Sequence, residues 1–138
     1  MDEDLGMANV NMVVPTKLMK LFIPDFLKRG HGKILNVSST VALTPGSLQA
    51  EYYATKAYLT SLSNAIWYEL KYTGVTCTVL MPGVMDTGFE SASDLTTTKM
   101  FENTGKPDNV AKDGYKGMLD GKLSVVSGLL GGKALLLD

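Results

Sequence analysis

Helical and strand-like patterns alternate along this chain, and the alternation restricts the folds that it can adopt. Apolar residues recur at three- and four-residue spacing in some segments, and short apolar or β-branched runs stand between them. A sequence that repeats helix and strand in this order predicts an α/β fold, in which parallel strands of one sheet are joined by helices. The expected helices cover residues 8–29, 51–72 and 108–119, and the expected strands cover 33–37, 75–81 and 123–126.

Proline and glycine mark the ends of these segments. Gly30 and Gly74 follow the first two helical patterns, where glycine is the usual residue that ends a helix. Asp108 is suited to cap the start of the third helix. Pro15 and Pro24 lie inside the first pattern, so we expect a proline in an early turn and a kink near Pro24.

Two apolar stripes are expected to face the core. They comprise Val10, Val14, Leu18, Leu21, Phe22 and Phe26 in the first helix, and Tyr58, Leu62, Ala65, Ile66 and Leu70 in the second.

Composition excludes several classes of protein. The 138 residues amount to one domain, and 45% hydrophobic with 20% charged residues is typical of a soluble globular chain. A net charge of −1 without a basic stripe argues against nucleic acid as a partner. With Cys77 as the single cysteine and His31 as the single histidine, neither a disulfide nor a metal site is expected. No apolar run is long enough to span a membrane and the start is acidic, so we expect a cytoplasmic protein.

Tyr52 and Lys56 form a pair that carries acid–base chemistry. They are four residues apart, so on a helix both side chains project from one face. A phenol normally titrates at about pH 10, and a nearby ammonium stabilises the phenolate and makes the phenol a usable proton donor. A solvated helix face produces the same spacing by accident, so the pair alone does not establish a site.

Polar residues at the ends of the predicted strands support the pair. Ser39 follows the strand at 33–37, and Pro82-Gly83 ends the strand at 75–81. Because the carboxyl ends of parallel strands face the ligand crevice, these segments are expected to meet there. Asn11, early in the first helix, has an amide that can hold a water or a main-chain group.

Four segments together resemble one enzyme family. They are Val-Asn-Met around Asn11, the strand Gly32–Ser39, the segment Tyr52–Lys56, and Met81–Thr87. In this combination the chain resembles the classical short-chain dehydrogenases/reductases, and within them the DltE-like branch of ketone and secondary-alcohol reductases. The resemblance runs in register over most of residues 1–126.

The resemblance implies a catalytic role for four residues. Tyr52 would donate the proton to a carbonyl, or accept it in the oxidation of an alcohol. Lys56 would lower the pKa of Tyr52, Ser39 would hydrogen-bond the substrate oxygen, and Asn11 would anchor a water in a proton relay. Ser38 and Tyr53 are the neighbouring alternatives, and only Ser39 and Tyr52 fit the family spacing.

The resemblance also implies NADP or NAD as the hydride carrier. Lys56 and Tyr52 would bind the nicotinamide ribose, and Pro82, Gly83 and Thr87 would contact the nicotinamide end. The family's glycine-rich phosphate-binding turn does not occur in this sequence; residues 128–132 are glycine-rich, but we interpret them as a flexible turn.

We therefore expect residues 1–138 to be a single partial Rossmann domain. It would be the catalytic half of a doubly wound parallel sheet, with about three parallel strands and three main helices, and the nucleotide-binding half would lie outside this sequence. The strand at 33–37 would then be an unpaired edge.

Two functions remain open at this point. The first is an NAD(P)-dependent oxidoreductase that acts on a small carbonyl or alcohol and is inactive as this isolated chain. The second is a non-catalytic remnant. Either would form homo-oligomers through the helices at 8–29 and 51–73, as the family's dimers often do.

Overall fold

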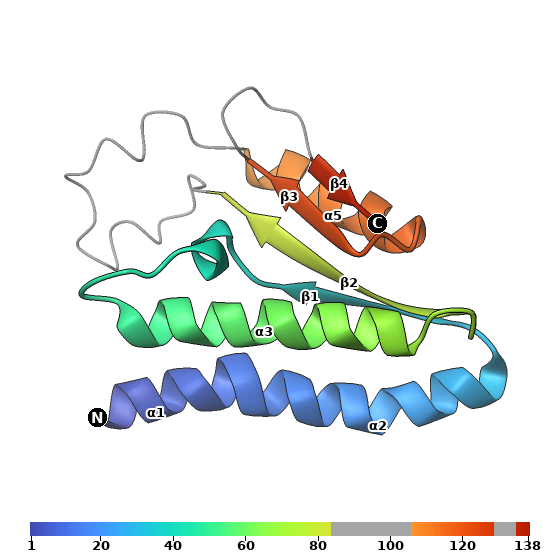
Figure 1. Cartoon of the computed structure of the whole chain (residues 1–138), viewed down its shortest axis with the longest axis horizontal. Coiled ribbons are helices and arrows are strands. Elements are labelled where there is room, and N and C mark those ends of the chain that lie inside the picture. The colour runs from blue at the N-terminus through green and yellow to red at the C-terminus, as the bar shows by residue number, and fades with distance from the viewer. Residues whose placement is uncertain (84–105, 129–134) are drawn as a thin grey trace.

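The computed structural model describes residues 1–83, 106–128 and 135–138, and these residues build one sheet. Its strand order is β1 (Gly32–Val37), β2 (Val75–Pro82), β3 (Ser124–Ser127) and β4 (Leu135–Leu137) (Figure 1). The first three strands are parallel, and β4 pairs with β3 in the antiparallel direction. The three predicted parallel strands are confirmed, whereas β4 was not predicted.

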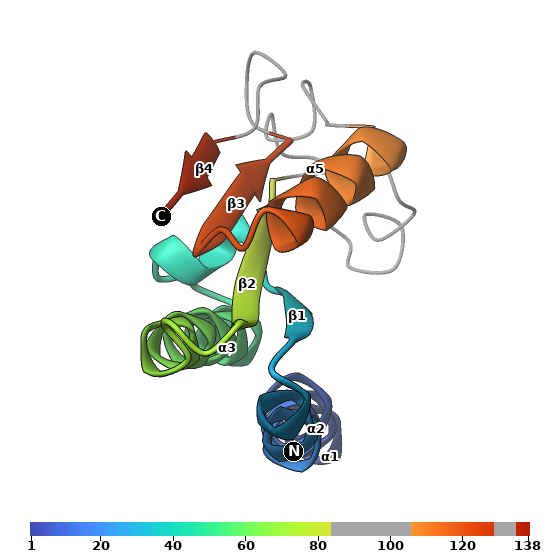
Figure 2. The same ribbon diagram turned by 90° about the vertical axis from the view of Figure 1, so that its right-hand side faces the viewer.

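Helices cover both faces of the sheet. One face carries α1 (Asp2–Ala8), α2 (Val14–Arg29) and α3 (Ala50–Glu69), and the other carries α5 (Pro107–Leu119) (Figure 2). A π-helical turn, Asn9–Val13, joins α1 to α2, and a 3-10 turn, Thr40–Leu43, follows β1. The arrangement is the α/β fold expected from the sequence, a partial Rossmann domain with three main helices.

The ends of the helices differ in part from the predictions. The first helical segment begins at Asp2 rather than at residue 8, and Pro24 lies within α2. The glycine cap is confirmed, because Gly30 adopts a left-handed φ of 75°. The cap predicted at Asp108 is wrong: the helix starts at Pro107 without a side-chain cap, and Asp108 lies in its first turn.

The core lies around β2, which is buried along nearly its whole length. One cluster joins Met19 of α2 and Leu70 to Cys77 of β2, and another joins Leu80 of β2 to Val110 and Val125. On α3, the fully buried positions are Thr55, Leu59, Thr60 and Ser63, so hydroxyl side chains supply much of the face that packs on the sheet.

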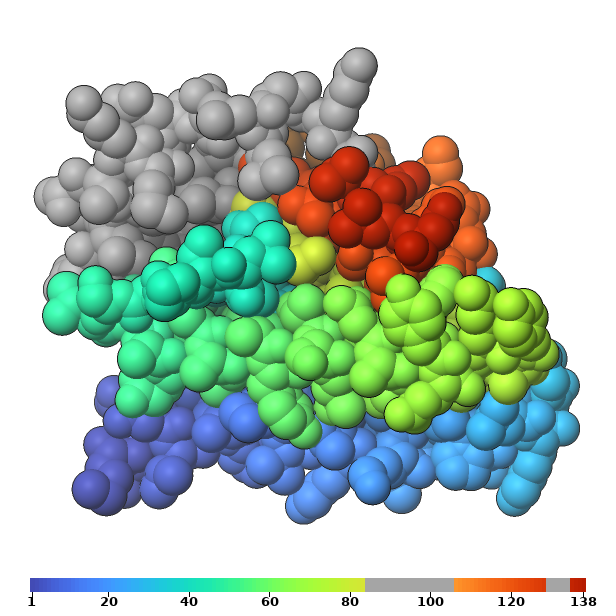
Figure 3. All heavy atoms as spheres, viewed as in Figure 1, coloured from blue at the N-terminus to red at the C-terminus, as the bar shows by residue number. Residues whose placement is uncertain are grey.

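The predicted stripe on the first helix is largely exposed. Leu18, Leu21 and Phe22 are 48%, 68% and 51% exposed, and only Met19 of α2 is buried. The apolar residues therefore have the predicted helical spacing, but the prediction that they are buried in the core is wrong. In the space-filling view α3 forms a band beside α1–α2 (Figure 3).

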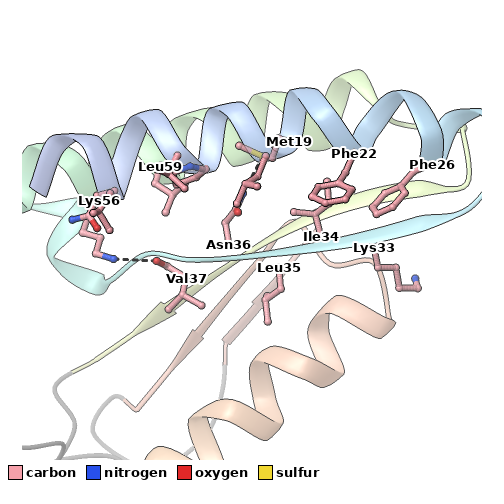
Figure 4. Close-up of a pocket in the computed structure, with 15 residues that line it drawn as sticks. Met19, Phe22, Phe26, Lys33, Ile34, Leu35, Asn36, Val37, Lys56 and Leu59 are labelled. Carbon is pink, nitrogen blue, oxygen red and sulfur yellow. Dashed lines mark hydrogen bonds between the residues drawn. The ribbon is translucent and has the colours of Figure 1, made fainter. Parts of the chain in front are cut away.

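The outer edge of β1 is unpaired within the described sheet, as expected. A groove of about 430 Å³ runs along it, between β1 and the α1–α2 segment (Figure 4). Apolar side chains of α2 form most of one wall, and Asn11 and Lys56 also line the groove. None of the described helices is long and apolar enough to cross a membrane.

Candidate active site

The site is assembled where β1 ends and α3 begins. After β1 the chain turns back through residues 40–49, so α3 runs antiparallel to the strand and its first turns lie beside the strand's carboxyl end. This connection brings Ser39, at the end of the strand, close to Tyr52 and Lys56 on the first two turns of the helix. The proximity follows from the strand–helix–strand topology.

Ser39 and Tyr52 are hydrogen-bonded through their side chains. The Ser39 hydroxyl also accepts a hydrogen bond from the Val41 amide at 3.3 Å, which fixes it at the start of the 3-10 turn. Both side chains are half-buried, so they are partly accessible to a ligand. A hydroxyl and a phenol placed together can hold one carbonyl oxygen between them.

Lys56 lies on the same side of the helix as Tyr52. Its Nζ donates a hydrogen bond to the carbonyl oxygen of Val37 at 3.1 Å (Figure 4). The same Nζ lies 5.8 Å from the centroid of the Tyr52 ring. The ammonium is therefore held at the end of β1 and within range of the phenol's ring.

Burial dominates the electrostatics of this pair. It raises the pKa of Tyr52 above its ordinary value of 10.0, and the hydrogen bond with Ser39 opposes the shift without cancelling it. Burial also lowers the pKa of Lys56 from 10.5. Burial is therefore the largest influence on the phenol, and the lowering of its pKa by Lys56 remains a prediction.

Asn11 lies in the middle of the π-helical turn. Its Nδ2 donates to Thr55 Oγ1 at 3.1 Å, and Thr55 Oγ1 donates to the main-chain oxygen of Tyr52 at 2.9 Å. Asn11 is thus linked to the first turn of α3 through Thr55, and it lines the same groove as Lys56. The water relay proposed for Asn11 remains a prediction.

Pro82 and Gly83 lie at the end of β2. Pro82 is buried, and the Gly83 amide donates to the main-chain oxygen of Ser127 at 2.7 Å, which fixes the strand end against β3. Both residues are at the carboxyl edge that also carries Ser39. Thr87, the third residue predicted to contact the cofactor, lies outside the described residues.

The groove beside β1 holds only part of the candidate site. Asn11 and Lys56 reach it, but Ser39 and Tyr52 are not among its lining residues. The groove therefore marks the open edge of the sheet.

Ser38 has a structural role that sequence reasoning did not assign. It is 4% exposed, and its hydroxyl bonds to α3, so it is far less accessible to a ligand than the half-buried Ser39. Thr60, its partner on α3, was also missed. The only signal in the sequence was the set of hydroxyl residues on an otherwise apolar helix face.

Other polar candidates do not form sites. Within residues 1–83, 106–128 and 135–138, no group of His, Cys, Asp and Glu side chains could hold a metal ion. Cys77 is buried, as predicted for a core thiol, and burial raises its pKa to about 11.

Comparison with known proteins identifies a matching family and several related sequences. The sequence model described as short chain dehydrogenase matches residues 5–97. The chain is 32% identical over 103 residues to hydroxysteroid dehydrogenase-like protein 1 of Gallus gallus, covering 73% of this chain and 31% of that protein. It is 31% identical over 104 residues to an uncharacterized oxidoreductase of Staphylococcus epidermidis, covering 75% of this chain and 45% of that protein.

A solved structure shows the same fold. The short-chain dehydrogenase of Sphingobium yanoikuyae in complex with NADPH superposes with a TM-score of 0.74 at 24% identity, covering 84% of this chain and 45% of that one. The chain thus spans less than half the length of each of these three proteins.

Proposed function

This chain belongs to the short chain dehydrogenase family, and we propose that it forms the catalytic half of an NAD(P)-dependent oxidoreductase that interconverts a carbonyl and a secondary alcohol. The observation that carries the proposal is the convergence of Ser39, Tyr52 and Lys56 at the carboxyl end of β1. The four motifs most resemble the DltE-like branch, and we propose a small ketone or secondary alcohol as the substrate.

Tyr52 is the group that moves a proton. In the direction of reduction its phenol gives its proton to the substrate oxygen, and in oxidation the phenolate takes it back. The Ser39 hydroxyl holds the same oxygen and so fixes it at the phenol. Because burial raises the phenol's pKa above its ordinary value, the phenol is protonated at neutral pH and can act as an acid.

Lys56 supplies positive charge beside the phenolate. Its Nζ donates to the Val37 oxygen, and a shift of the side chain toward Tyr52 would stabilise the phenolate. Asn11 supports the first turn of α3 through Thr55.

The residues present fit one end of the implied cofactor. Lys56 and Tyr52 offer a cation and a hydroxyl for the ribose, and the ends of β1 and β2 offer main-chain groups for the nicotinamide. When bound, the dinucleotide supplies or accepts the hydride. The sequence holds no glycine-rich turn for its phosphates, so we propose that residues 1–138 alone do not turn over.

A chimera tests this proposal. The segment of the Staphylococcus epidermidis relative that precedes its matched region is fused to residue 1, and oxidation of NADPH is followed with a panel of small ketones. Ketone-dependent oxidation by the chimera, with none by the isolated chain, is expected. A chimera that binds NADPH but oxidises it with none of the ketones, and shows no reverse reaction with the corresponding alcohols, would contradict the proposal.

A second candidate is a non-catalytic module that self-associates through the helices at 8–29 and 51–73. The exposed Leu18, Leu21 and Phe22 favour it, because apolar residues clustered on one helix often mark an interface. Nucleotide fluorescence separates the two functions: saturable NADPH binding by the isolated chain would exclude a purely non-catalytic role.

A further inference from the structure

Three successive residues at the end of β1 each bond to α3. The Val37 oxygen accepts from the Lys56 side chain, the Ser38 hydroxyl donates to the Lys56 main-chain oxygen at 2.9 Å, and Ser39 bonds to Tyr52. The outer two contacts involve half-buried or exposed groups, which water reaches. The central contact is made by Ser38, which is itself buried.

Ser38 is fixed from both sides. Its main-chain amide donates to the Leu80 oxygen of β2 at 2.7 Å, which holds it in the sheet. Its hydroxyl accepts a hydrogen bond from Thr60 Oγ1 at 2.6 Å while it donates to Lys56. With Ser38 4% and Thr60 9% exposed, little solvent competes for these bonds.

We infer that Ser38 and Thr60 form a buried hydroxyl clamp that sets the position of α3 against the end of β1, and so holds Tyr52 against Ser39. Thr60 is one turn beyond Lys56 and about two turns beyond Tyr52 on the same helix. A slip of α3 by one residue would move Tyr52 by about 1.5 Å, enough to break a hydrogen bond.

The chemistry of the two hydroxyls supports this role. A threonine inside a helix ordinarily bonds to the main-chain oxygen four residues earlier, which for Thr60 is the oxygen of Lys56. Here Ser38 takes that oxygen, and Thr60 bonds to Ser38 instead. The bond that a helix would satisfy internally is thereby diverted to the strand, and this ties the two elements together.

Ser38 and Thr60 are therefore positioning residues. Their hydroxyls bond to each other and to the Lys56 main chain, and they act through the placement of Tyr52. This inference rests on the proposed function, because the placement matters to catalysis only if Tyr52 is the proton donor.

The whole chain, labelled with ¹³C at the tyrosine ring, provides the test. The Tyr52 signal is assigned by its loss in Tyr52→Phe, and its titration is followed in the parent, in Thr60→Val, which loses the hydroxyl at nearly constant shape, and in Thr60→Ser, which keeps it. Thr78→Val is the matched control, because it removes a buried hydroxyl on β2 that donates to the main-chain oxygen of Lys122.

Thr60→Val is expected to lower the Tyr52 midpoint toward the ordinary phenol value. A loosened α3 admits water to the ring, which lowers the pKa, and weakens the bond with Ser39, which raises it; burial is the larger of these two effects, so the midpoint should fall. Thr60→Ser and Thr78→Val should titrate like the parent. At neutral pH, the nuclear Overhauser contact between Tyr52 and Ser39 should weaken in Thr60→Val alone.

If Thr60→Val does not fold, Ser38→Ala replaces it, since Thr60 can then bond to Lys56 within the helix. A folded clamp variant with the parent's midpoint and contact would overturn the clamp, and so would an equal shift in Thr78→Val. Neither result depends on turnover by the chimera, so failure of the proposed function and failure of the clamp are separate outcomes.

Discussion

The phenol of Tyr52 on the first turn of α3 is hydrogen-bonded to the hydroxyl of Ser39 at the end of β1. The bond joins a helix to the strand that precedes it, and Lys56 Nζ lies 5.8 Å from the same ring. Because all three groups depend on one strand–helix connection, small changes in that connection should register in the titration of Tyr52.

Ser39→Ala should raise the pKa of Tyr52 further. The hydrogen bond with Ser39 favours the phenolate and so lowers the pKa, while burial raises it. Removing the hydroxyl leaves burial unopposed, and the ¹³C titration midpoint should move up. Ser47→Ala, at an exposed position in the same connection, is the control. An unchanged midpoint in Ser39→Ala would mean that the bond does not persist in solution.

The Cys77 thiol should react slowly with alkylating agents, and its ionisation should destabilise the fold at alkaline pH. Burial raises its pKa from 9.0 to about 11, so at pH 8 roughly one thiol in a thousand is ionised in the folded chain and alkylation should be slow. A folded pKa above the unfolded one contributes stability that is complete below pH 9 and is lost as the pH rises through about 11. The loss should be at most about 2.7 kcal/mol.

Cys77→Ala isolates that contribution. Tyr52 and Lys56 also titrate at alkaline pH, but both remain in the variant. The raised pKa of Tyr52 lowers stability as the pH rises, as that of Cys77 does, whereas the lowered pKa of Lys56 makes stability rise with pH. The free energy of unfolding, measured with denaturant at several pH values, should therefore fall less steeply above pH 9 in Cys77→Ala than in the parent. Equal slopes would show that the thiol is accessible to water.

Asn36→Asp should destabilise the chain at neutral pH. The Asn36 amide donates to Ser63 Oγ at 2.9 Å and to Met19 Sδ at 3.2 Å. A carboxylate of the same shape cannot donate, and the loss should be about 1–3 kcal/mol. Because the folded carboxyl would have a raised pKa, stability should recover as the pH falls.

Asn109→Asp, on the exposed first turn of α5, gives the matched charge change. Negative charge is favourable there, so its denaturant midpoint should equal or exceed that of the parent. If both variants unfold at the parent's midpoint, the Asn36 network contributes nothing measurable.

Leu21→Glu tests self-association through the helix at 8–29. Leu21 is 68% exposed, so a charge there should leave the fold intact but oppose burial in an interface. Sedimentation should give 14.9 kDa for the variant and a multiple of that mass for the parent. Lys20→Glu, on the same exposed turn, should keep the parent's mass. A parent that sediments as a monomer would remove the proposed oligomer.

The parallel strands could be predicted because their residues are distinctive. β2 is rich in β-branched residues and ends at Pro82-Gly83, and no helix would favour that composition. β4 was missed because Leu135–Leu137 is only three residues long, and leucine does not favour a strand. Its pairing with β3 is a tertiary contact that no local pattern records.

The residues that come together at the candidate site could be predicted from the sequence, but their electrostatics could not. Family spacing brought Ser39, Tyr52 and Lys56 together, and the topology agrees with it. The rise in the pKa of Tyr52 depends on how deeply the ring is buried, which sequence does not reveal. The structural role of Ser38 and Thr60 was missed because buried hydroxyls look polar in a sequence, and only their bonds to each other and to the Lys56 main chain account for their burial.

The most direct test of the central claim compares Tyr52→Phe with Tyr53→Phe in the chimera. Each variant removes one phenol hydroxyl from adjacent positions on α3. Loss of general acid catalysis should reduce kcat of Tyr52→Phe by about 10²–10⁴-fold with NADPH affinity nearly unchanged, and Tyr53→Phe should retain the parent's kcat. A Tyr52→Phe chimera that turns over at the parent's rate would contradict the assignment of Tyr52 as the proton donor.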